Sequence, residues 1–148
     1  MSDCVFCEIV RGTAPSSMVH ADDIAVALMD IRPVNEGHIL IEPRAHAAYL
    51  DNLDRETGAH LFRVAMELSQ ALRQSGVRCE GVDLFLADGE AAGQEVFHVH
   101  LHVIPRYQGD GFGFRFGPHY HLLPERARLD EVASDIRQAV EVGRHAVE

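Results

Sequence analysis

The chain has 148 residues, of which 47% are hydrophobic, and this length and composition suit one domain with a buried core. We therefore expect a single domain over residues 1–148. Its 13 basic and 23 acidic residues give a formal net charge of -10, which opposes general binding to nucleic-acid backbones and to anionic membranes. An anionic ligand would need a local site, and ten histidines are available to build one.

The N-terminal sequence MSDCVFCEIV has neither a basic region nor a long apolar run. No segment approaches the ~20 consecutive apolar residues of a membrane-spanning helix. We therefore expect a soluble, cytoplasmic protein with no membrane partner and no nucleic-acid partner. Cys4 and Cys7 form a Cys-x-x-Cys pair, which in a reducing compartment indicates metal binding or redox chemistry.

In chain order, the sequence predicts short elements of both kinds. We expect a loop at 11–17, strands at 24–29, 38–42, 82–87 and 96–104, a long helix between Asp54 and Gly76, and a C-terminal helix from 130 to about 144. The long helix has an apolar stripe at Leu61, Ala65, Leu68 and Leu72, which Phe62 and Met66 widen. Helices and strands that do not alternate regularly predict an α+β fold, with a largely antiparallel sheet and the long helix packed across it.

The segment 97–104 alternates strictly between apolar residues and His98, His100 and His102. Since successive side chains of a strand point to opposite faces, the three imidazoles should share one face, and Phe97, Val99, Leu101 and Val103 should enter the core. A merely solvated polar face is the alternative, but a row of ionisable rings favours a functional site. Zinc binding by two neighbouring rings, general acid–base catalysis and nucleophilic catalysis all remain open. One ion cannot bind all three rings, because the outer two would lie about 13 Å apart along the strand.

Several motifs elsewhere in the chain have a specific order and spacing. They are Cys4-Val-Phe-Cys7, Met29-Asp30-Ile31, Gly37-His38, Pro43-Arg44-Ala45-His46, Gly89 through Gln94, HVHLHVI at 98–104 and Pro105-Arg106. Together they resemble bacterial members of the histidine triad (HIT) family of nucleotide hydrolases and transferases. The resemblance covers the chain except its C-terminal part. It implies a HIT-like fold, with an antiparallel sheet of about five strands and one long helix, usually paired in a homodimer.

The resemblance also implies catalytic roles. His100 would attack the α-phosphorus of a purine nucleotide and form a covalent nucleotidyl-histidine, which water then hydrolyses. An imidazole suits this step because it is largely neutral at pH 7. The backbone carbonyl of His98 would hold the Nδ1–H of His100, and His102 would face the phosphate or the leaving group. Gln94 would lie beside the phosphate, in a glycine-containing loop at 88–94 that is otherwise typical of a surface turn.

Further residues match substrate positions of the family. Asp30 would accept hydrogen bonds from the ribose hydroxyls, and His38 would lie near the three histidines. An apolar slot for the base would be lined by Val5, Phe6, Ile9 and Met29. For each of these four residues, plain core packing is the alternative.

In family members with the cysteine pair, the resemblance implies a zinc site formed by Cys4, Cys7, His46 and His98. Such a Cys2His2 set leaves no open position, so the zinc would be structural and would fix the N-terminus to the sheet. Free buried thiols are the alternative. Cys79, which lies alone after the long helix, is expected to be a small apolar filler.

Two positions depart from the family pattern. Ala87 replaces an asparagine near the phosphate, and Glu95 replaces a serine or threonine. As a free carboxylate, Glu95 is expected to favour amine leaving groups over polyphosphates by charge repulsion. The leading hypothesis is a nucleoside phosphoramidase or dinucleoside polyphosphate hydrolase. The alternatives are a nucleotide- and zinc-binding regulatory protein with little turnover, and a zinc hydrolase that uses His98 and His100 as ligands.

Overall fold

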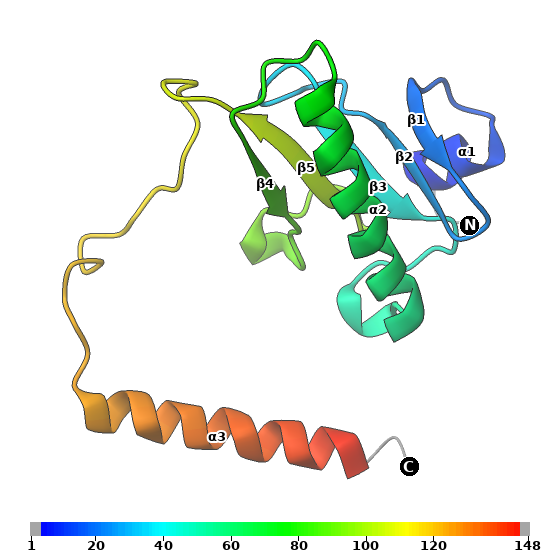
Figure 1. Ribbon diagram of the computed structural model, residues 1–148. Helices are drawn as coiled ribbons and strands as arrows, with labels where there is room; N and C mark the ends of the chain where they lie inside the picture. The colour runs from blue at the N-terminus through cyan, green and yellow to red at the C-terminus, as the bar shows by residue number, and fades with distance from the viewer. Residues whose placement is uncertain (1–3, 146–148) are drawn as a thin grey trace. The chain divides into compact units, whose positions relative to one another are not determined.

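The computed structural model describes residues 4–145, which form two compact units, residues 4–112 and residues 113–145 (Figure 1). The first unit contains α1 (Val5–Arg11), β1 (Met18–Ala21), β2 (Ala25–Met29), β3 (Ile39–Pro43), the short 3-10 helix η1 (Leu50–Asn52), α2 (Arg55–Gln74), β4 (Gly81–Phe85), the 3-10 helix η2 (Glu90–Ala92) and β5 (Leu101–Arg106). The second unit contains α3 (Arg126–His145). The single domain over residues 1–148 stays a prediction.

The first unit is built on one sheet of five strands in the order β1-β2-β3-β5-β4. Each neighbouring pair is antiparallel. β2 and β3 lie inside the sheet, and their residues are buried except for Met29, which is half-buried. This architecture confirms the predicted α+β class, with a largely antiparallel sheet of about five strands and a long packed helix.

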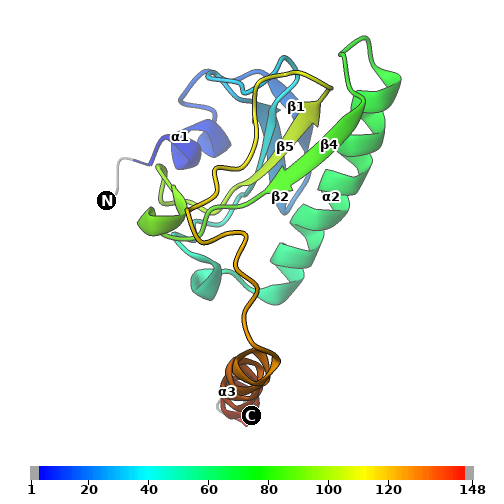
Figure 2. The ribbon, with the colours of Figure 1, turned by 90° about the vertical axis from the view of Figure 1, so that its left-hand side faces the viewer.

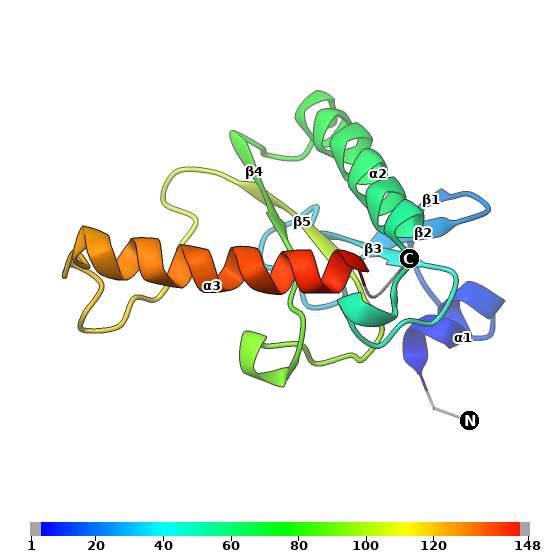
Figure 3. The same cartoon turned by 90° about the horizontal axis from the view of Figure 1, so that it is seen from below.

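Helices cover both faces of the sheet, as Figure 2 shows. The core on the α2 face includes Ile39, Ile41, Leu61, Val64, Ala65, Leu68, Leu72, Val99, Leu101 and Val103. The core on the opposite face consists of Cys4, Phe6, Ile9, Val26, Leu28 and Leu40. Because β3 side chains alternate, Ile39 and Ile41 face α2 whereas Leu40 faces α1. Figure 3 shows η2 on the same side of the sheet as α1, so α1 and the η2 loop border one face.

Helix α2 follows the predicted stripe, with differences at its end and on its flank. Asp54 caps its start, accepting a hydrogen bond from the Thr57 backbone N–H at 2.9 Å. The helix ends at Gln74 with an extended Ser75 as its C-cap, so Gly76, the expected end of the helix, is not its C-cap. Phe62 and Met66 were expected to widen the stripe, but they are 53% and 60% exposed. Val64 is buried instead, since it follows Leu61 by three residues on the same face.

The predicted strand at 96–104 is wrong in its first half. The strand β5 begins at Leu101, and β3 pairs with it only through Ile39–Ile41. Pro43 stands where the ladder would continue, and proline has no N–H to donate. Its carbonyl instead accepts a hydrogen bond from Nε2 of His98 at 2.8 Å. Val99 is buried as predicted, whereas Phe97 is 41% exposed and does not enter the core.

Sequence patterns missed α1 and β1, which have only seven and four residues. They also extended β4 two residues too far. In the second unit, α3 confirms the predicted C-terminal helix, and its residues Val132, Ile136 and Val140 remain exposed. None of the helices within residues 4–145 combines the length and apolar character needed to cross a bilayer.

Candidate functional site

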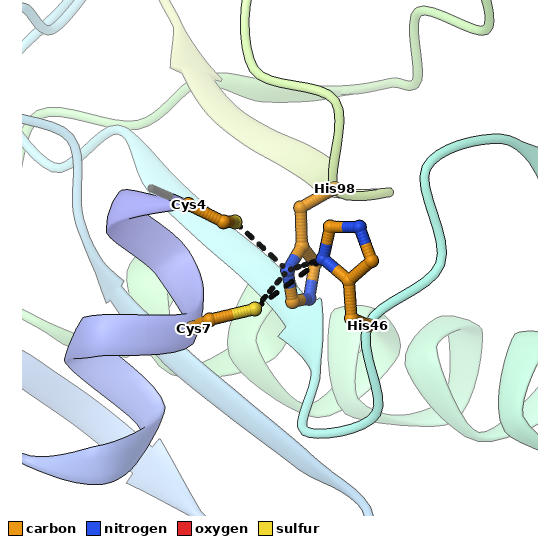
Figure 4. A group of neighbouring side chains, drawn as sticks. All are labelled: Cys4, Cys7, His46 and His98. Atoms are coloured by element: carbon orange, nitrogen blue, oxygen red, sulfur yellow. Dashed lines mark hydrogen bonds between the residues drawn. The ribbon is translucent and has the colours of Figure 1, made fainter. Parts of the chain in front are cut away.

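Two cysteines and two histidines meet where α1 contacts the segment before β5 (Figure 4). Cys4 and Cys7 lie at the start of α1, His46 follows β3, and His98 precedes β5. Nδ1 of His98 lies 3.4 Å from the Cys4 sulfur, 3.5 Å from the Cys7 sulfur and 3.3 Å from Nδ1 of His46. The Cys7 sulfur lies 3.3 Å from Nδ1 of His46. The structure therefore brings together the four residues that the resemblance assigned to zinc.

These distances fit a tetrahedral zinc ion. With Zn–S and Zn–N bonds of about 2.3 and 2.05 Å, the edges of such a site are about 3.6 Å between S and N and about 3.4 Å between two N atoms. His98 also has the required tautomer, because its Nε2 donates to the Pro43 carbonyl and leaves a lone pair on Nδ1. The four donors would complete the coordination shell, so the site suits a structural metal.

Burial affects the ionisation of these ligands. Desolvation and the neighbouring Cys4 thiol raise the pKa of the Cys7 thiol, and burial lowers the pKa of His98. His98 is therefore neutral at pH 7 and can coordinate a cation, whereas the Cys7 thiol keeps its proton until a metal displaces it. Nδ1 of His98 belongs to this cluster and Nε2 donates to the Pro43 carbonyl. No lone pair of His98 is left for an ion shared with His100, so this geometry does not support the hypothesis of a zinc hydrolase with His98 and His100 on one ion.

His100 is oriented by the backbone of the preceding histidine. Its Nδ1–H donates to the carbonyl of His98 at 2.7 Å, which leaves the lone pair on Nε2 free. The Phe6 ring and the imidazole pack in a T-shaped arrangement with centroids 5.1 Å apart, and His100 is only 7% exposed. This arrangement gives an immobilised, accessible nitrogen nucleophile.

A second hydrogen-bond chain fixes the tautomer of His102. The Val34 backbone N–H donates to Nδ1 of His38 at 3.1 Å, so Nε2 of His38 carries the proton. That Nε2–H donates to Nδ1 of His102 at 2.9 Å, so His102 has its own proton on Nε2. Burial, with the nearby His100 and His38, lowers the pKa of His102 to about 4. His102 is therefore a neutral hydrogen-bond donor at pH 7.

The same chain excludes a metal at a second group of potential ligands, Asp30, His38 and His102, whose donor atoms lie within 4.8 Å of one another. A metal would need the lone pair of Nε2 of His38, but that atom holds a proton.

The backbone before His38 requires a glycine. Gly37 has a φ of 94°, and a Cβ at this position would lie 2.7 Å from the Val77 side chain.

A pocket of about 580 Å³ lies beside these histidines on the α1 face of the sheet. All seven residues predicted to bind substrate line it: Val5, Phe6, Ile9, Met29, Asp30, His38 and Glu95. His100, His102 and Gly93 also line it, as do Arg32 and Phe85, which the sequence did not indicate. The predicted apolar slot and the two oriented histidines thus share one cavity. His98 and Gln94 do not line it.

Gln94 faces inward rather than into the pocket. Its Oε1 accepts a hydrogen bond from the Gly89 N–H at 2.8 Å, and its Nε2 donates to the carbonyls of Ala48 and Val96 at 2.8 and 3.1 Å. The side chain is buried, and its amide is fully used within the protein. Gln94 therefore positions the loop that presents Gly93 and Glu95, which corrects its expected place beside the phosphate.

Glu95 is paired, which corrects its expected role as a free carboxylate. Its Oε2 accepts a hydrogen bond from the Arg32 guanidinium at 2.9 Å, and both side chains are exposed. Arg32 was missed because the two residues are 63 positions apart. In the sequence, the position of Arg32 two residues after Asp30 was the one feature that pointed to a role in the site. Ala87, the other departure from the family pattern, is buried and does not line the pocket.

Comparison with known proteins agrees with this geometry. The family model of the HIT domain matches residues 11–109. An uncharacterized HIT-like protein from Borreliella burgdorferi is 40% identical over 127 residues, which cover 85% of this chain and 91% of that protein. The adenylylsulfatase HINT3 of Arabidopsis thaliana is 33% identical over 142 residues, which cover 94% of this chain and 68% of that protein.

Solved structures give the same result. A Zn-bound histidine triad family protein from Mycobacterium smegmatis is similar at a TM-score of 0.73 and 41% identity, covering 78% of this chain and 84% of that one. A HIT family protein from Bacillus anthracis is similar at a TM-score of 0.84 and 34% identity, covering 93% and 97% of the two chains. With the motifs, the fold and the family model in agreement, the chain belongs to the histidine triad (HIT) family.

Proposed function

We propose that this protein hydrolyses a bond to the α-phosphate of a purine nucleotide through a covalent nucleotidyl intermediate on Nε2 of His100. The observation that carries the proposal is that the tautomers of His100 and His102 are both fixed by hydrogen bonds and that both rings line one pocket. His100 has a free lone pair on Nε2, and His102 has a proton on Nε2. Such a pair supplies a nucleophile and a hydrogen-bond donor to the same phosphate.

In the first step, the Nε2 lone pair of His100 attacks phosphorus, and the leaving group departs with the electrons of its bond. An amine leaving group takes a proton from a water molecule as its N–P bond breaks, because an amide anion is too basic to depart. The hydroxide that this leaves is neutralised by the proton that the attacking water loses in the second step. The imidazolium that forms keeps its proton on Nδ1, where the His98 carbonyl stabilises it. Water attacks phosphorus in the second step, which releases the nucleoside monophosphate and restores neutral His100. Because the pKa of His102 is lowered to about 4, His102 stabilises the phosphate as a neutral donor in both steps.

The remaining pocket residues suit a nucleoside. Phe6, Ile9 and Met29 offer an apolar surface for a base, and Asp30 offers carboxylate oxygens for the ribose hydroxyls. The names of relatives support the same substrate class, since one is an adenylylsulfatase and another is a histidine triad nucleotide-binding protein. The proposed substrates are adenosine phosphoramidates and dinucleoside polyphosphates.

Zinc has a structural role in this proposal. Bound by Cys4, Cys7, His46 and His98, it would join α1 to the segment that precedes β5 and add cohesion between them. His98 serves both sites, because its ring belongs to the metal cluster while its carbonyl holds His100. The metal cluster thus supports the orientation of the nucleophile without touching the substrate.

The proposal also includes a homodimer. β4 is a terminal strand of the sheet, and its Leu84 and Phe85 are 38% and 42% exposed. An edge strand with apolar side chains favours pairing with another strand. Analytical ultracentrifugation at micromolar concentration should give twice the mass of the chain, and a monomer would contradict this part of the proposal.

The test is the variant His100→Ala, assayed with an adenosine phosphoramidate. It should lose at least about a thousandfold in kcat. It should still bind AMP, because the apolar slot and Asp30 are unchanged. The control His60→Ala replaces a histidine of α2, in the same unit as the pocket, that does not line the pocket, and it should retain wild-type kcat. If the wild type binds AMP but has no measurable turnover, the protein is instead a nucleotide- and zinc-binding regulatory protein.

A further inference from the structure

We infer that Arg32 binds the non-reacting phosphates of the nucleotide or its leaving group, and that Glu95 is an internal anion that competes for the same guanidinium. The inference rests on the proposed function and adds a subsite to that pocket. In the structure the Arg32 guanidinium donates to the Glu95 carboxylate at 2.9 Å. In the loaded pocket the guanidinium exchanges this carboxylate for a phosphate of the ligand.

The charges around the pocket single out Arg32. Among the described residues that line it, Asp30 and Glu95 are acidic and Arg32 is the one arginine or lysine. A nucleotide brings further negative charge into a chain whose formal net charge is already -10. Arg32 is therefore the permanent positive charge at the pocket that can offset a polyphosphate.

The backbones of both residues are held while their side chains remain free to move. The Arg32 N–H donates to Oδ1 of Asp30 at 2.8 Å, which ties the arginine to the residue proposed to bind ribose. Glu95 follows Gln94, whose buried amide fixes the loop. The two side chains are 81% and 75% exposed, so they can change partners without disturbing the core.

Arg32 should bind the phosphates of a polyphosphate more strongly than the Glu95 carboxylate, which favours replacing the carboxylate by the ligand. An exposed ion pair contributes little free energy, so breaking it costs little. A polyphosphate carries more negative charge than a carboxylate, and its oxygens match the planar donors of a guanidinium. AMP has a single phosphate, which the proposed mechanism places at His100 and His102. Arg32 therefore stays paired with Glu95 when AMP is bound. Glu95 thus weakens the binding of polyphosphates relative to monophosphates.

The test measures the ratio of ATP to AMP affinity by calorimetry, without added divalent cations, in the wild type, Glu95→Gln, Arg32→Gln and the double variant. Glu95→Gln should raise this ratio about three- to fivefold, and Arg32→Gln should lower it by a similar factor. In the absence of Arg32, replacing Glu95 should have a smaller effect. Salt should reduce all of these differences, because the groups are exposed.

The matched controls are Glu80→Gln and Arg78→Gln, which break an exposed ion pair of the first unit, away from the pocket lining, whose N–O distance is 3.1 Å. They change net charge by the same amounts and should leave the ratio unchanged. If AMP binds normally but the ratio is the same in all variants, the subsite is overturned while the proposed function stands. If neither nucleotide binds the wild type, the proposed function and the subsite both fail.

Discussion

Replacing the buried Glu42 by glutamine should stabilise the protein in a strongly pH-dependent way. Glu42 lies on β3 and is 0% exposed, and neither of its carboxylate oxygens has a hydrogen-bond partner among the described residues. Burial without a partner disfavours the charged form, so the pKa of this carboxyl rises to about 8 from a usual value of 4.5. Glutamine has nearly the same shape and no charge.

The direction of the pH dependence follows from the number of protons that the folded and the unfolded protein bind. Below pH 4.5 the carboxyl is protonated in both states and contributes no pH dependence. Between pH 4.5 and 8 the folded state holds a proton that the unfolded state has lost, so the free energy of unfolding falls as pH rises. The full difference corresponds to about 5 kcal/mol at pH 8. Glu42→Gln removes this loss, so its stabilising effect should grow from about zero at pH 4.5 to several kcal/mol at pH 8.

The assay is urea unfolding of wild type and variant at fixed zinc content, at half-unit steps from pH 5 to pH 8.5. The control is Glu67→Gln, which removes an exposed carboxylate from α2 and should change stability by less than about 0.5 kcal/mol at every pH. Parallel pH profiles for wild type and Glu42→Gln would refute the assignment of a buried, protonated carboxyl. They would mean that Glu42 is ionised and solvated in the folded state.

Three further predictions concern the metal cluster, the tautomer chain and the β1–β2 turn. Cys7→Ser should lower zinc content from about one per chain and reduce the melting temperature, while single-turnover chemistry persists; metal-free wild type of unchanged melting temperature would contradict this. His38→Ala should lower kcat by about tenfold or more with little change in KM, because His102 loses the donor that fixes its tautomer; rescue by a glutamine at this position would support positioning, and unchanged kcat would count against it. Asp22 accepts hydrogen bonds from His20 and His60 at 2.7 Å each, which contribute to a lowered pKa of its carboxyl, so Asp22→Asn should destabilise the protein by about 1–3 kcal/mol at pH 6 and progressively less as pH falls below about 4. Equal stability of the two proteins at pH 6 would contradict that prediction.

Local periodicity predicted much of the fold. Apolar spacing placed α2 and its buried stripe, and the expected start at Asp54 coincides with the N-cap of the helix. It could not place the beginning of β5, because that depends on Pro43 in a strand far away in sequence. Short elements such as α1 and β1 are below the length at which a period is visible.

The parts of the candidate site that consist of motif residues were predictable from the sequence. The hydrogen bonds and ion pairs between residues far apart in the sequence were not. The cysteine and histidine motifs indicated a cluster that the structure assembles within 4.8 Å. The inward turn of Gln94 and the ion pair of Arg32 with Glu95 depend on loop conformations, which leave no periodic pattern in the sequence. The direction of the chain from Val34 through His38 to His102 also required coordinates.

Trapping the covalent intermediate tests the role of His100 most directly. Wild-type protein should be mixed with an adenosine phosphoramidate, quenched within milliseconds in alkaline denaturant to preserve the acid-labile N–P bond, and digested for mass spectrometry. An adenylyl group on His100, absent from His100→Ala and lost at the rate of turnover, is the expected result. Turnover without any adduct, or an adduct on His98 or His102, would contradict nucleophilic catalysis by His100.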